Sequence, residues 1–373
     1  MRPGATRAGA PEATAATTSA PTVRAAAHAP AFDAEPAAVP SAPGRAAWRA
    51  LRANRAAFVS LWFLALFALA SLLAPLWPLP SPSALDLRAE PLAPVAPWEC
   101  FVERGFAPAP EDPGWFDRAL VRARVAAFGD LRTGPWLGTD AKGRDLLARI
   151  VFGSRTSILV ALAAAATSLA IGVLYGAFSG LAGGRVDEAM MRLVDVLYAV
   201  PFVFAVIFVI TLVEAWEERI EALGIDREVV LYLVIGAISW LSMARVVRGQ
   251  VLALRRAEFV EAASVLGASR ARILWTHVLP NVAPIVIVYL TLTIPSIVLY
   301  ESFLSFLGLG IAPPDVSWGL LAADGAAAIN PLRVAWWLVV FPAAAMGSVL
   351  LALNVLGDGL RDALDPKDAR SRR

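Results

Sequence analysis

The chain has 373 residues, of which 58% are hydrophobic and 17% are charged. Soluble globular domains have about 45–50% apolar and about 25% charged residues, so this composition indicates a membrane protein. A formal net charge of +2 excludes the broad basic field that binds nucleic acid. Cys100 is the only cysteine, which excludes an internal disulfide and a multi-cysteine metal site, and the distant His28 and His277 predict no histidine-rich metal site.

The N-terminal stretch 1–44 is rich in Ala, Pro and Thr and contains no apolar run, so we expect a disordered tail. Its arginine-bearing, acid-poor start can imitate an organelle transit peptide, but proline breaks the amphipathic helix that such a peptide needs. The stretch 45–77 is predicted to be a short lead-in followed by the first membrane span.

Apolar runs of membrane-spanning length follow. About twenty apolar residues cross the bilayer core as a helix. Six runs reach this length, and because backbone polar groups cannot stay unpaired in lipid, we expect all of them to be helices. The runs are 57–77, 157–181, 189–213, 229–252, 282–306 and 334–356, with soft boundaries for the fourth and sixth. The core of the fold is thus expected over 157–357.

The distribution of arginine predicts the orientation. Basic residues in short loops mark the cytoplasmic side. The arginine-rich stretches before span one, between spans two and three, after span four and after span six all fall on one side. The opposite loop 214–228 is acidic, and 310–333 has few charges. Both termini, including the tail 358–373, are therefore predicted to be cytoplasmic.

The stretch 78–156 is predicted to be an extracytoplasmic insertion, since long loops translocate largely regardless of their charge. Its proline-rich part 78–110 is expected to be irregular, whereas 112–128 has the periodicity of an amphipathic helix. Asp140 and Gly143 predict a turn that leads into a short helix lying on the membrane surface.

Polar side chains inside membrane spans indicate function by default. Glu301 is expected either to meet a substrate amine or, as the commoner role of such a glutamate, to pair with an arginine or a backbone amide at a gate. The candidates for a translocation path or gate are Ser239, Thr291, Thr293, Ser296, Glu301 and Ser302.

Small residues and prolines inside the spans predict how the helices pack and bend. A four-residue spacing of glycine allows close helix packing, either within the chain or against a partner. Prolines are expected to kink the third, fifth and sixth spans. Asp195 is expected to pair with Arg192 on the same helix. The glycines are Gly172, Gly176 and Gly180, and the prolines are Pro201, Pro295 and Pro342.

The loop 253–281, between spans four and five, contains EAASVLGASRARILWTHVLPN at 261–281. A helix is favoured before Gly267, which interrupts it, and helical character resumes over 268–277 until Pro280 stops it. These features predict two short cytoplasmic helices joined at a glycine elbow. The residues alone leave two roles open: a docking surface for another protein, or a solvated loop on lipid headgroups.

This loop resembles the signature of permease subunits in ATP-binding cassette importers, in which E-A-A is followed by three residues, G, nine residues, an apolar position, one residue and L-P. The stretches 137–144, 244–250, 301–310 and 358–366 are similar to the dipeptide and oligopeptide branch, and the resemblance covers about 52–367. The outer stretch 91–132 is longer than the commonest form of that branch. The signature residues are Glu261, Ala262, Ala263, Gly267, Leu279 and Pro280, with His277 at the usually apolar position.

The resemblance implies an all-α membrane protein with the six-helix architecture of type I importer permeases, located in the bacterial inner membrane. It implies peptide import, half of a translocation path, and contact with an ATPase subunit through the signature loop. The implied partners are a second homologous permease, two ATPase subunits that bind ATP and Mg, and a periplasmic substrate-binding protein. No phosphate-binding loop motif is present, so the chain itself is expected to bind no cofactor and to be no enzyme.

Other functions remain open as alternatives. An importer of nickel, opines or glycosides with the same architecture belongs to the same class. An ion-coupled secondary transporter, or an intramembrane enzyme, belongs to a different class. A secondary transporter is expected to show buried charged pairs at mid-span and an internal inverted repeat, and neither is evident in the sequence.

Overall fold

The computed structural model describes residues 43–85, 92–94, 103–104, 114–129, 131–216, 219, 222, 227–329 and 334–364. The chain divides into two units, Met1–Ser41 and Ala42–Arg373, and every described element belongs to the second. The expected disordered tail therefore lies outside the described residues, apart from its last two positions. These two positions already belong to the first helix.

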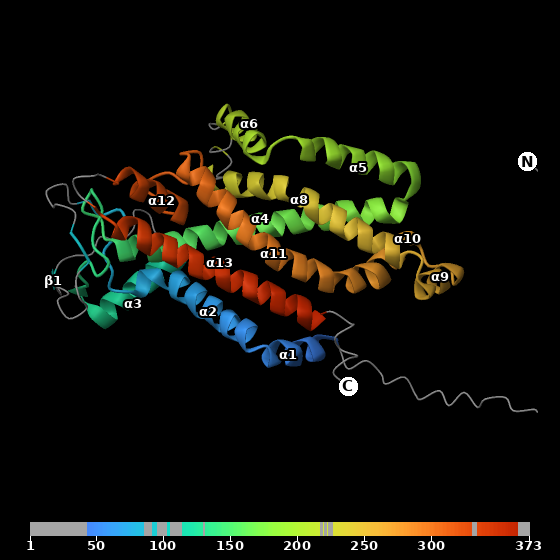
Figure 1. The fold of residues 1–373 in the computed structure, drawn as a ribbon, viewed down its shortest axis with the longest axis horizontal. Coiled ribbons are helices and arrows are strands. Elements are labelled where there is room, and N and C mark those ends of the chain that lie inside the picture. Colours follow the sequence, from blue (N-terminus) through green and yellow to red (C-terminus); the bar gives the residue numbers. More distant parts are fainter. Residues whose placement is uncertain are drawn as a thin grey trace, which may run out of the picture. The chain divides into compact units, whose positions relative to one another are not determined.

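Helices make up most of the described chain (Figure 1). The two-residue strands β1 (Glu103–Arg104) and β2 (Leu131–Arg132) form a short antiparallel ladder. The helical elements are α1 (Pro43–Ala53), α2 (Arg55–Leu72), the 3-10 turn η1 (Ala74–Leu76), α3 (Trp115–Phe128), α4 (Leu146–Ala182), α5 (Gly184–Ala199), α6 (Phe202–Glu214), α8 (Arg227–Leu254), α9 (Glu258–Val265), α10 (Arg270–Ile273), the π-helical turn η3 (Leu274–Val278), α11 (Leu279–Phe306), α12 (Trp318–Ala327) and α13 (Trp337–Leu364).

Five continuous helical stretches are long and apolar enough to cross a bilayer, and the bent pair α5 and α6 supplies a sixth if it counts as one span. This confirms the all-α membrane fold. The third span is more than kinked, because its two helices meet at 91°. Pro201 stands directly before α6, and proline both lacks an N–H donor and disfavours helical geometry in the residue before it.

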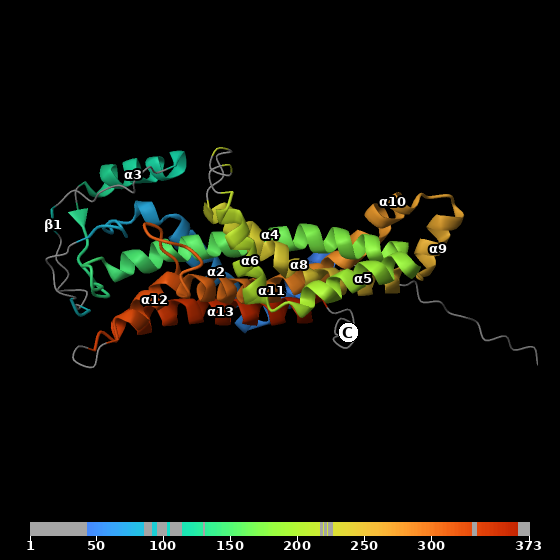
Figure 2. The same ribbon diagram turned by 90° about the horizontal axis from the view of Figure 1, so that it is seen from above.

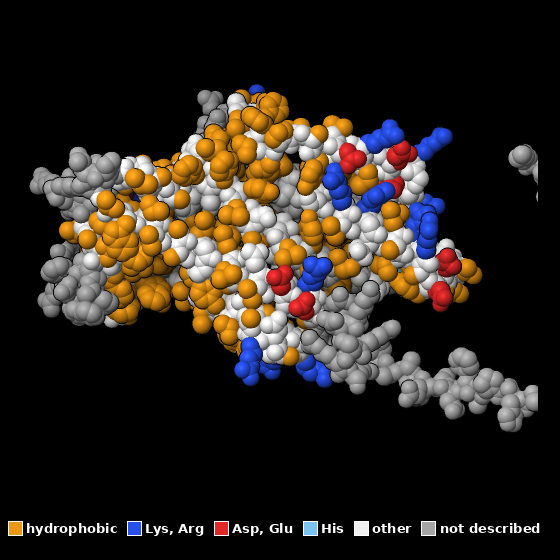
Figure 3. Space-filling view, in the orientation of Figure 1, with side chains coloured by type: hydrophobic (Ala, Val, Ile, Leu, Met, Phe, Trp, Pro, Cys, Tyr) orange, Lys and Arg blue, Asp and Glu red, His pale blue; other side chains and the backbone are white. Residues whose placement is uncertain are grey.

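The two ends of the described bundle carry different elements. Figure 2 shows α9 and α10 at one end, which we term the elbow end, and β1, α3 and α12 at the other, the far end. In Figure 3, Lys and Arg side chains gather toward the elbow end, whereas hydrophobic side chains cover much of the visible middle. This separation is what a bilayer requires of a spanning bundle.

The second span is longer than expected. Helix α4 runs unbroken for 37 residues, or about 55 Å at 1.5 Å per residue, against a hydrocarbon core of about 30 Å. The predicted short surface helix is therefore wrong, because 146–156 form the first turns of α4. The predicted turn is confirmed: Gly143 has φ +74°. Asp145 caps the helix by accepting the N–H of Ala148 at 2.7 Å.

Glycine brings α4 and α8 into close contact along much of their length. A methyl group built on Gly172 would lie 2.6 Å from Cβ of Met243, and one on Gly180 would lie 2.8 Å from Cβ of Val251. At Gly176 it would meet the backbone carbonyl of Ala244. The glycine stripe thus packs within the chain, and small residues serve this purpose where lipid offers no hydrophobic driving force.

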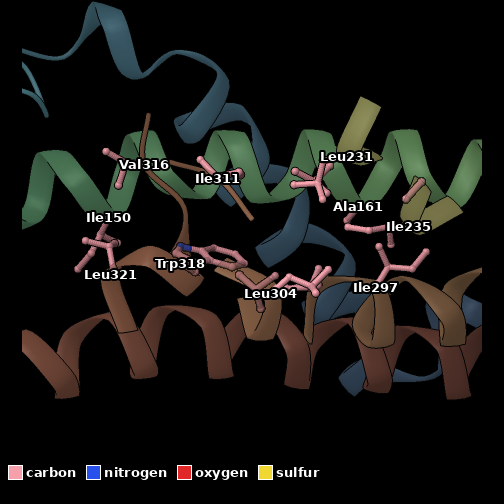
Figure 4. Packing of buried hydrophobic residues seen from close by; sticks show 14 of the residues in the cluster. Ile150, Ala161, Leu231, Ile235, Ile297, Leu304, Ile311, Val316, Trp318 and Leu321 are labelled. Carbon is pink, nitrogen blue, oxygen red and sulfur yellow. The ribbon is translucent and has the colours of Figure 1, made fainter. Parts of the chain in front are cut away.

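The main hydrophobic core lies toward the far end, where α4, α8 and α11 meet and α12 and α13 close over them. Figure 4 shows Ala161, Leu231, Ile235 and Ile297 facing one another at this junction. Trp318 at the start of α12 is 1% exposed and fixes that short helix against the core. The core therefore joins the far-end loops to the spans.

Substituting Gly176→Ala is expected to lower the thermal unfolding midpoint of the detergent-solubilised chain, because the added methyl group must displace backbone of α8. Overpacking of this kind costs about 1–3 kcal/mol. The matched control is Gly249→Ala on α8, where a Cβ meets nothing within 4 Å. Equal midpoints for the two variants would contradict the close-contact role of Gly176.

Candidate functional site

The elbow is built from α9, a glycine turn and α10, as the sequence predicts. Gly267 has φ +83°, a conformation that glycine adopts without the penalty of a side chain. The N–H of Ala268 donates to the carbonyl of Ala263 at 3.0 Å, which closes the end of α9. Ser269 caps α10 by accepting the N–H of Arg272 at 3.3 Å. Local hydrogen bonds therefore hold the elbow in one shape.

The helix does not stop at Pro280, so that prediction is wrong. Helix α10 passes through the π turn η3 into α11, and the stretch Arg270–Phe306 forms one continuous span. Pro280 lies in the first turn of α11, where its missing N–H is tolerated. The side chain of Asn281 donates to the carbonyl of His277 at 2.6 Å. The second arm of the elbow is therefore a direct extension of the fifth span.

The tip of the elbow exposes apolar side chains that the sequence analysis did not single out. Val265 and Leu266 are 86% and 87% exposed. Glu261 and Ala262 are also exposed, whereas Ala263 is buried against the chain itself. Contiguous exposed apolar side chains mark a surface that binds a partner. The available sequence signal was two large apolar residues directly before the helix-breaking glycine.

Ion pairs near the elbow end tie α5 to α8. Asp187 accepts Nε and Nη2 of Arg248, both at 2.6 Å, and it also accepts the hydroxyl of Ser179 on α4 at 2.5 Å. A bidentate pair of this kind fixes both distance and orientation. The three helices α4, α5 and α8 are therefore joined at one point.

The expected pair between Arg192 and Asp195 is wrong. Arg192 pairs with Glu188 one turn earlier at 2.6 Å, while Asp195 accepts Nη2 of Arg245 on α8 at 2.8 Å. The guanidinium of Arg245 also lies 4.4 Å from the ring centroid of Tyr198. The arginine of α8 occupies the space beside Asp195, which the sequence spacing alone could not indicate.

A cavity of about 380 Å³ opens where the break between α5 and α6 faces α8 and α11. Phe202 stacks on Tyr300 at 4.1 Å between ring centroids and forms one wall. No described lining residue is charged. The polar lining consists of hydroxyl groups from Tyr198, Ser239, Ser242, Tyr289, Thr293, Ser296 and Tyr300. Ser239 and Thr293 donate to carbonyls of their own helices, so they can accept a ligand N–H, while the tyrosine hydroxyls can donate to a ligand carbonyl.

Only some of the candidate path residues line this cavity. Ser239, Thr293 and Ser296 line it. Thr291 does not, since its hydroxyl lies beside Gly357 of α13. Glu301 and Ser302 do not line it either, and both are buried. Sequence position alone could not separate these groups, because all of the candidates on α11 fall within four turns of one helix.

Glu301 is fully buried inside a cage of serine hydroxyls between α4 and α11. Its carboxylate accepts Ser305 at 2.8 Å, Ser157 at 3.2 Å and Ser302 at 3.4 Å. The Ser157 oxygen also accepts the N–H of Trp318 at 3.2 Å. A buried carboxylate needs such partners, and here they connect it to the start of α12. The geometry gives Glu301 a role in positioning the loop before α12.

Four charged residues form a cluster at the far end. Nη1 of Arg149 donates to Asp140 at 2.8 Å, and its Nη2 donates to Asp324 at 2.8 Å. Arg144 contacts the same two carboxylates, at 2.6 Å and 3.0 Å. Arg149 is 1% exposed, so the cluster joins the start of α4 to α12 within the protein. Across the described ranges, no group of three or more His, Cys, Asp or Glu residues can hold a metal ion.

Asp145, next to this cluster, supplies a pH-dependent contribution to stability. Burial raises its pKa to about 6, against the opposing effect of hydrogen bonds from the N–H groups of Ala148 and Leu147. The folded chain then keeps a proton that the unfolded chain releases above about pH 4. The contribution of Asp145 to stability therefore falls as pH rises from about 4 to about 6.

The variant Asp145→Asn is expected to lack this pH dependence, because asparagine caps a helix equally well and does not titrate. Across the same pH window, the thermal unfolding midpoint of the variant is expected to rise relative to the midpoint of the wild type as pH increases. Asp358→Asn, at an exposed position near the other end, serves as the control. Parallel curves for wild type and Asp145→Asn would contradict the assignment.

Comparisons with known families cover most of the chain. The profile of the family described as binding-protein-dependent transport system inner membrane component matches 172–369. The profile described as the N-terminal TM domain of oligopeptide transport permease C matches 42–94.

Individual relatives extend this similarity. The oligopeptide transport system permease protein OppC of Escherichia coli K12 is 42% identical over 329 residues, which is 87% of this chain and 93% of that protein. OppC of Haemophilus influenzae is 49% identical over 62% of this chain and 70% of its own length. The dipeptide transport system permease protein DppC of Bacillus subtilis is 44% identical over 62% of this chain and 68% of its own length.

One solved structure aligns over part of the chain. It is an inward-facing conformation of the MetNI methionine ABC transporter, with a TM-score of 0.43 and 17% sequence identity. The alignment covers 60% of this chain and 97% of that one. A likeness this weak carries no argument about the fold or the site.

Proposed function

Because this chain belongs to the family of binding-protein-dependent transport system inner membrane components, we propose that it is the permease subunit of an ATP-driven importer for peptides. Relatives that it resembles are named for oligopeptide and dipeptide transport. In this proposal the chain forms half of a translocation path and couples to an ATPase through its elbow.

The elbow is the observation that carries the proposal. A rigid two-helix projection ends in two exposed apolar residues and an exposed glutamate, and its second arm is continuous with the fifth span. A push on the tip is therefore transmitted to α11 without an intervening flexible loop. Rigid elements of this kind convert a movement at one interface into rocking of a whole helix pair.

The partners and orientation follow from the same mechanism. The chain contains no phosphate-binding loop motif, so ATP and Mg belong to two separate ATPase subunits, and this chain catalyses nothing by itself. A second homologous permease supplies the other half of the path, and a periplasmic binding protein delivers the substrate. The elbow end and both termini lie in the cytoplasm, as the loop arginines favour, and the membrane is the bacterial inner membrane.

The cavity favours peptides over the alternative cargoes. Its hydroxyl-lined, uncharged wall offers hydrogen bonds to backbone amides without selecting particular side chains. A nickel path would be expected to carry imidazole, thiolate or carboxylate ligands, and none of the lining residues provides one. An opine or glycoside importer stays an alternative, because hydroxyl groups bind those cargoes as well.

The elbow is tested by Glu261→Lys and by the double variant Val265→Ser, Leu266→Ser. Both are expected to lower the amount of ATPase that co-purifies by about tenfold or more, since each buried apolar anchor or ion pair at an interface contributes about 1–3 kcal/mol. Ile329→Ser, 72% exposed at the far end, is the matched control. ATPase retention and uptake at wild-type levels in the elbow variants would refute the docking role, as would ATP-independent transport by the chain alone.

The cavity is tested by Ser296→Phe, which places a ring among the lining hydroxyl groups. Peptide uptake is expected to be abolished while ATPase co-purification is unchanged, because the elbow is untouched. Ser348→Phe at an exposed position on α13 is the control. Normal uptake of labelled peptide by the Ser296 variant in membrane vesicles would exclude this cavity from the path.

A further inference from the structure

A second cavity, of about 280 Å³, lies toward the far end and shares no lining residue with the hydroxyl-lined cavity. Figures 1 and 2 place α3 at the end of the bundle where α4 begins. The walls come from the chain after α2, from α3, α4 and α8, and from the loop that leads to α12. The residues of its lining that carry the argument are Ser83, Asp117, Arg155, Thr156, Leu159 and Asp315.

The charges in this cavity suit a zwitterion. Oδ2 of Asp117 accepts Nη1 of Arg155 at 2.9 Å, while Oδ1 of Asp117 is buried and has no hydrogen-bond partner among the described residues. The Asp117 side chain lines the cavity and is 18% exposed, so its carboxylate can accept an N–H from a ligand bound there. Arg155 carries further N–H donors for an anionic oxygen, and Asp315 adds a second carboxylate.

An exposed apolar stripe begins in the same cavity. Leu159 lines the cavity and is 48% exposed. Residues spaced three or four apart along α4 continue the exposed side toward the elbow end: Leu162, Ala166, Ala170, Leu174 and Phe178. Arg155 stands just before this apolar stretch, which is the level of the lipid headgroups for a spanning helix. Polar and charged groups thus lie directly above a surface that fits an acyl chain.

We propose that this cavity binds an aminophospholipid of the phosphatidylethanolamine type. The phosphate contacts Arg155, the ammonium group contacts Asp117 and Asp315, and one acyl chain lies along the exposed stripe of α4. A free peptide shares the zwitterionic chemistry but has no acyl chain to cover the stripe. The proposal concerns a lipid site and does not depend on the transported substrate.

The test uses the full-length chain purified from membranes and native mass spectrometry with added phosphatidylethanolamine or phosphatidylglycerol. Wild type is expected to retain phosphatidylethanolamine in preference. Arg155→Gln is expected to retain about tenfold less lipid, the effect of losing one charge-assisted hydrogen bond. Asp315→Asn, in an exposed loop, is expected to lose the preference between the two lipids while its unfolding midpoint stays unchanged.

Two further variants separate lipid binding from folding. Thr156→Trp fills the cavity and leaves every charge in place, so it is expected to release the lipid as Arg155→Gln does. Arg118→Gln, on the exposed side of α3, is the matched control and is expected to bind as wild type does. Equal retention of both lipids by wild type, unchanged retention in Arg155→Gln or Thr156→Trp, or displacement of the lipid by glycylglycine would each overturn the proposal.

Discussion

The contact between α4 and α8 is the constraint on which the other features depend. Three glycines of α4 let the two helices approach until side chains and backbone carbonyls of α8 lie directly against α4. With α4 held on one side, α8 turns its other side to the hydroxyl-lined cavity and ends at the elbow. An additional methylene group between α4 and α8 would displace α8 as a unit, because a close-packed interior has no free volume to absorb it. The cavity wall and the elbow would then shift together.

Charged groups hold the two ends of this bundle in different ways. Near the elbow end, Asp187 joins α4, α5 and α8 through Arg248 and Ser179. At the far end, Arg149 joins the start of α4 to α12 through two carboxylates. Buried charges are stable only when paired, so each cluster favours one arrangement of its helices. The part of the bundle between the two clusters contains the uncharged cavity. The helices around a path for a polar cargo need to move there.

The elbow and the cavity are mechanically connected through α11. The second arm of the elbow continues into this helix, and five residues of the helix line the cavity wall: Tyr289, Leu292, Thr293, Ser296 and Tyr300. A tilt of α11 therefore changes the cavity without any rearrangement of side-chain chemistry. The buried Glu301, further along the same helix, ties the end of α11 to the loop before α12 through Ser305. One rigid helix thus connects both membrane surfaces.

The sequence by itself determined the membrane class, the six apolar runs, the helix that ends at Phe128 and the glycine elbow. These depend on local composition and periodicity, because a bilayer forces any long apolar run to pair its own backbone groups as a helix. The tertiary structure alone decided the 91° break at Pro201, the partner of Asp195, and which polar residues face the cavity. It also brought Asp140 and Asp324 into contact with Arg149, since residues so far apart in the chain meet only after the helices pack.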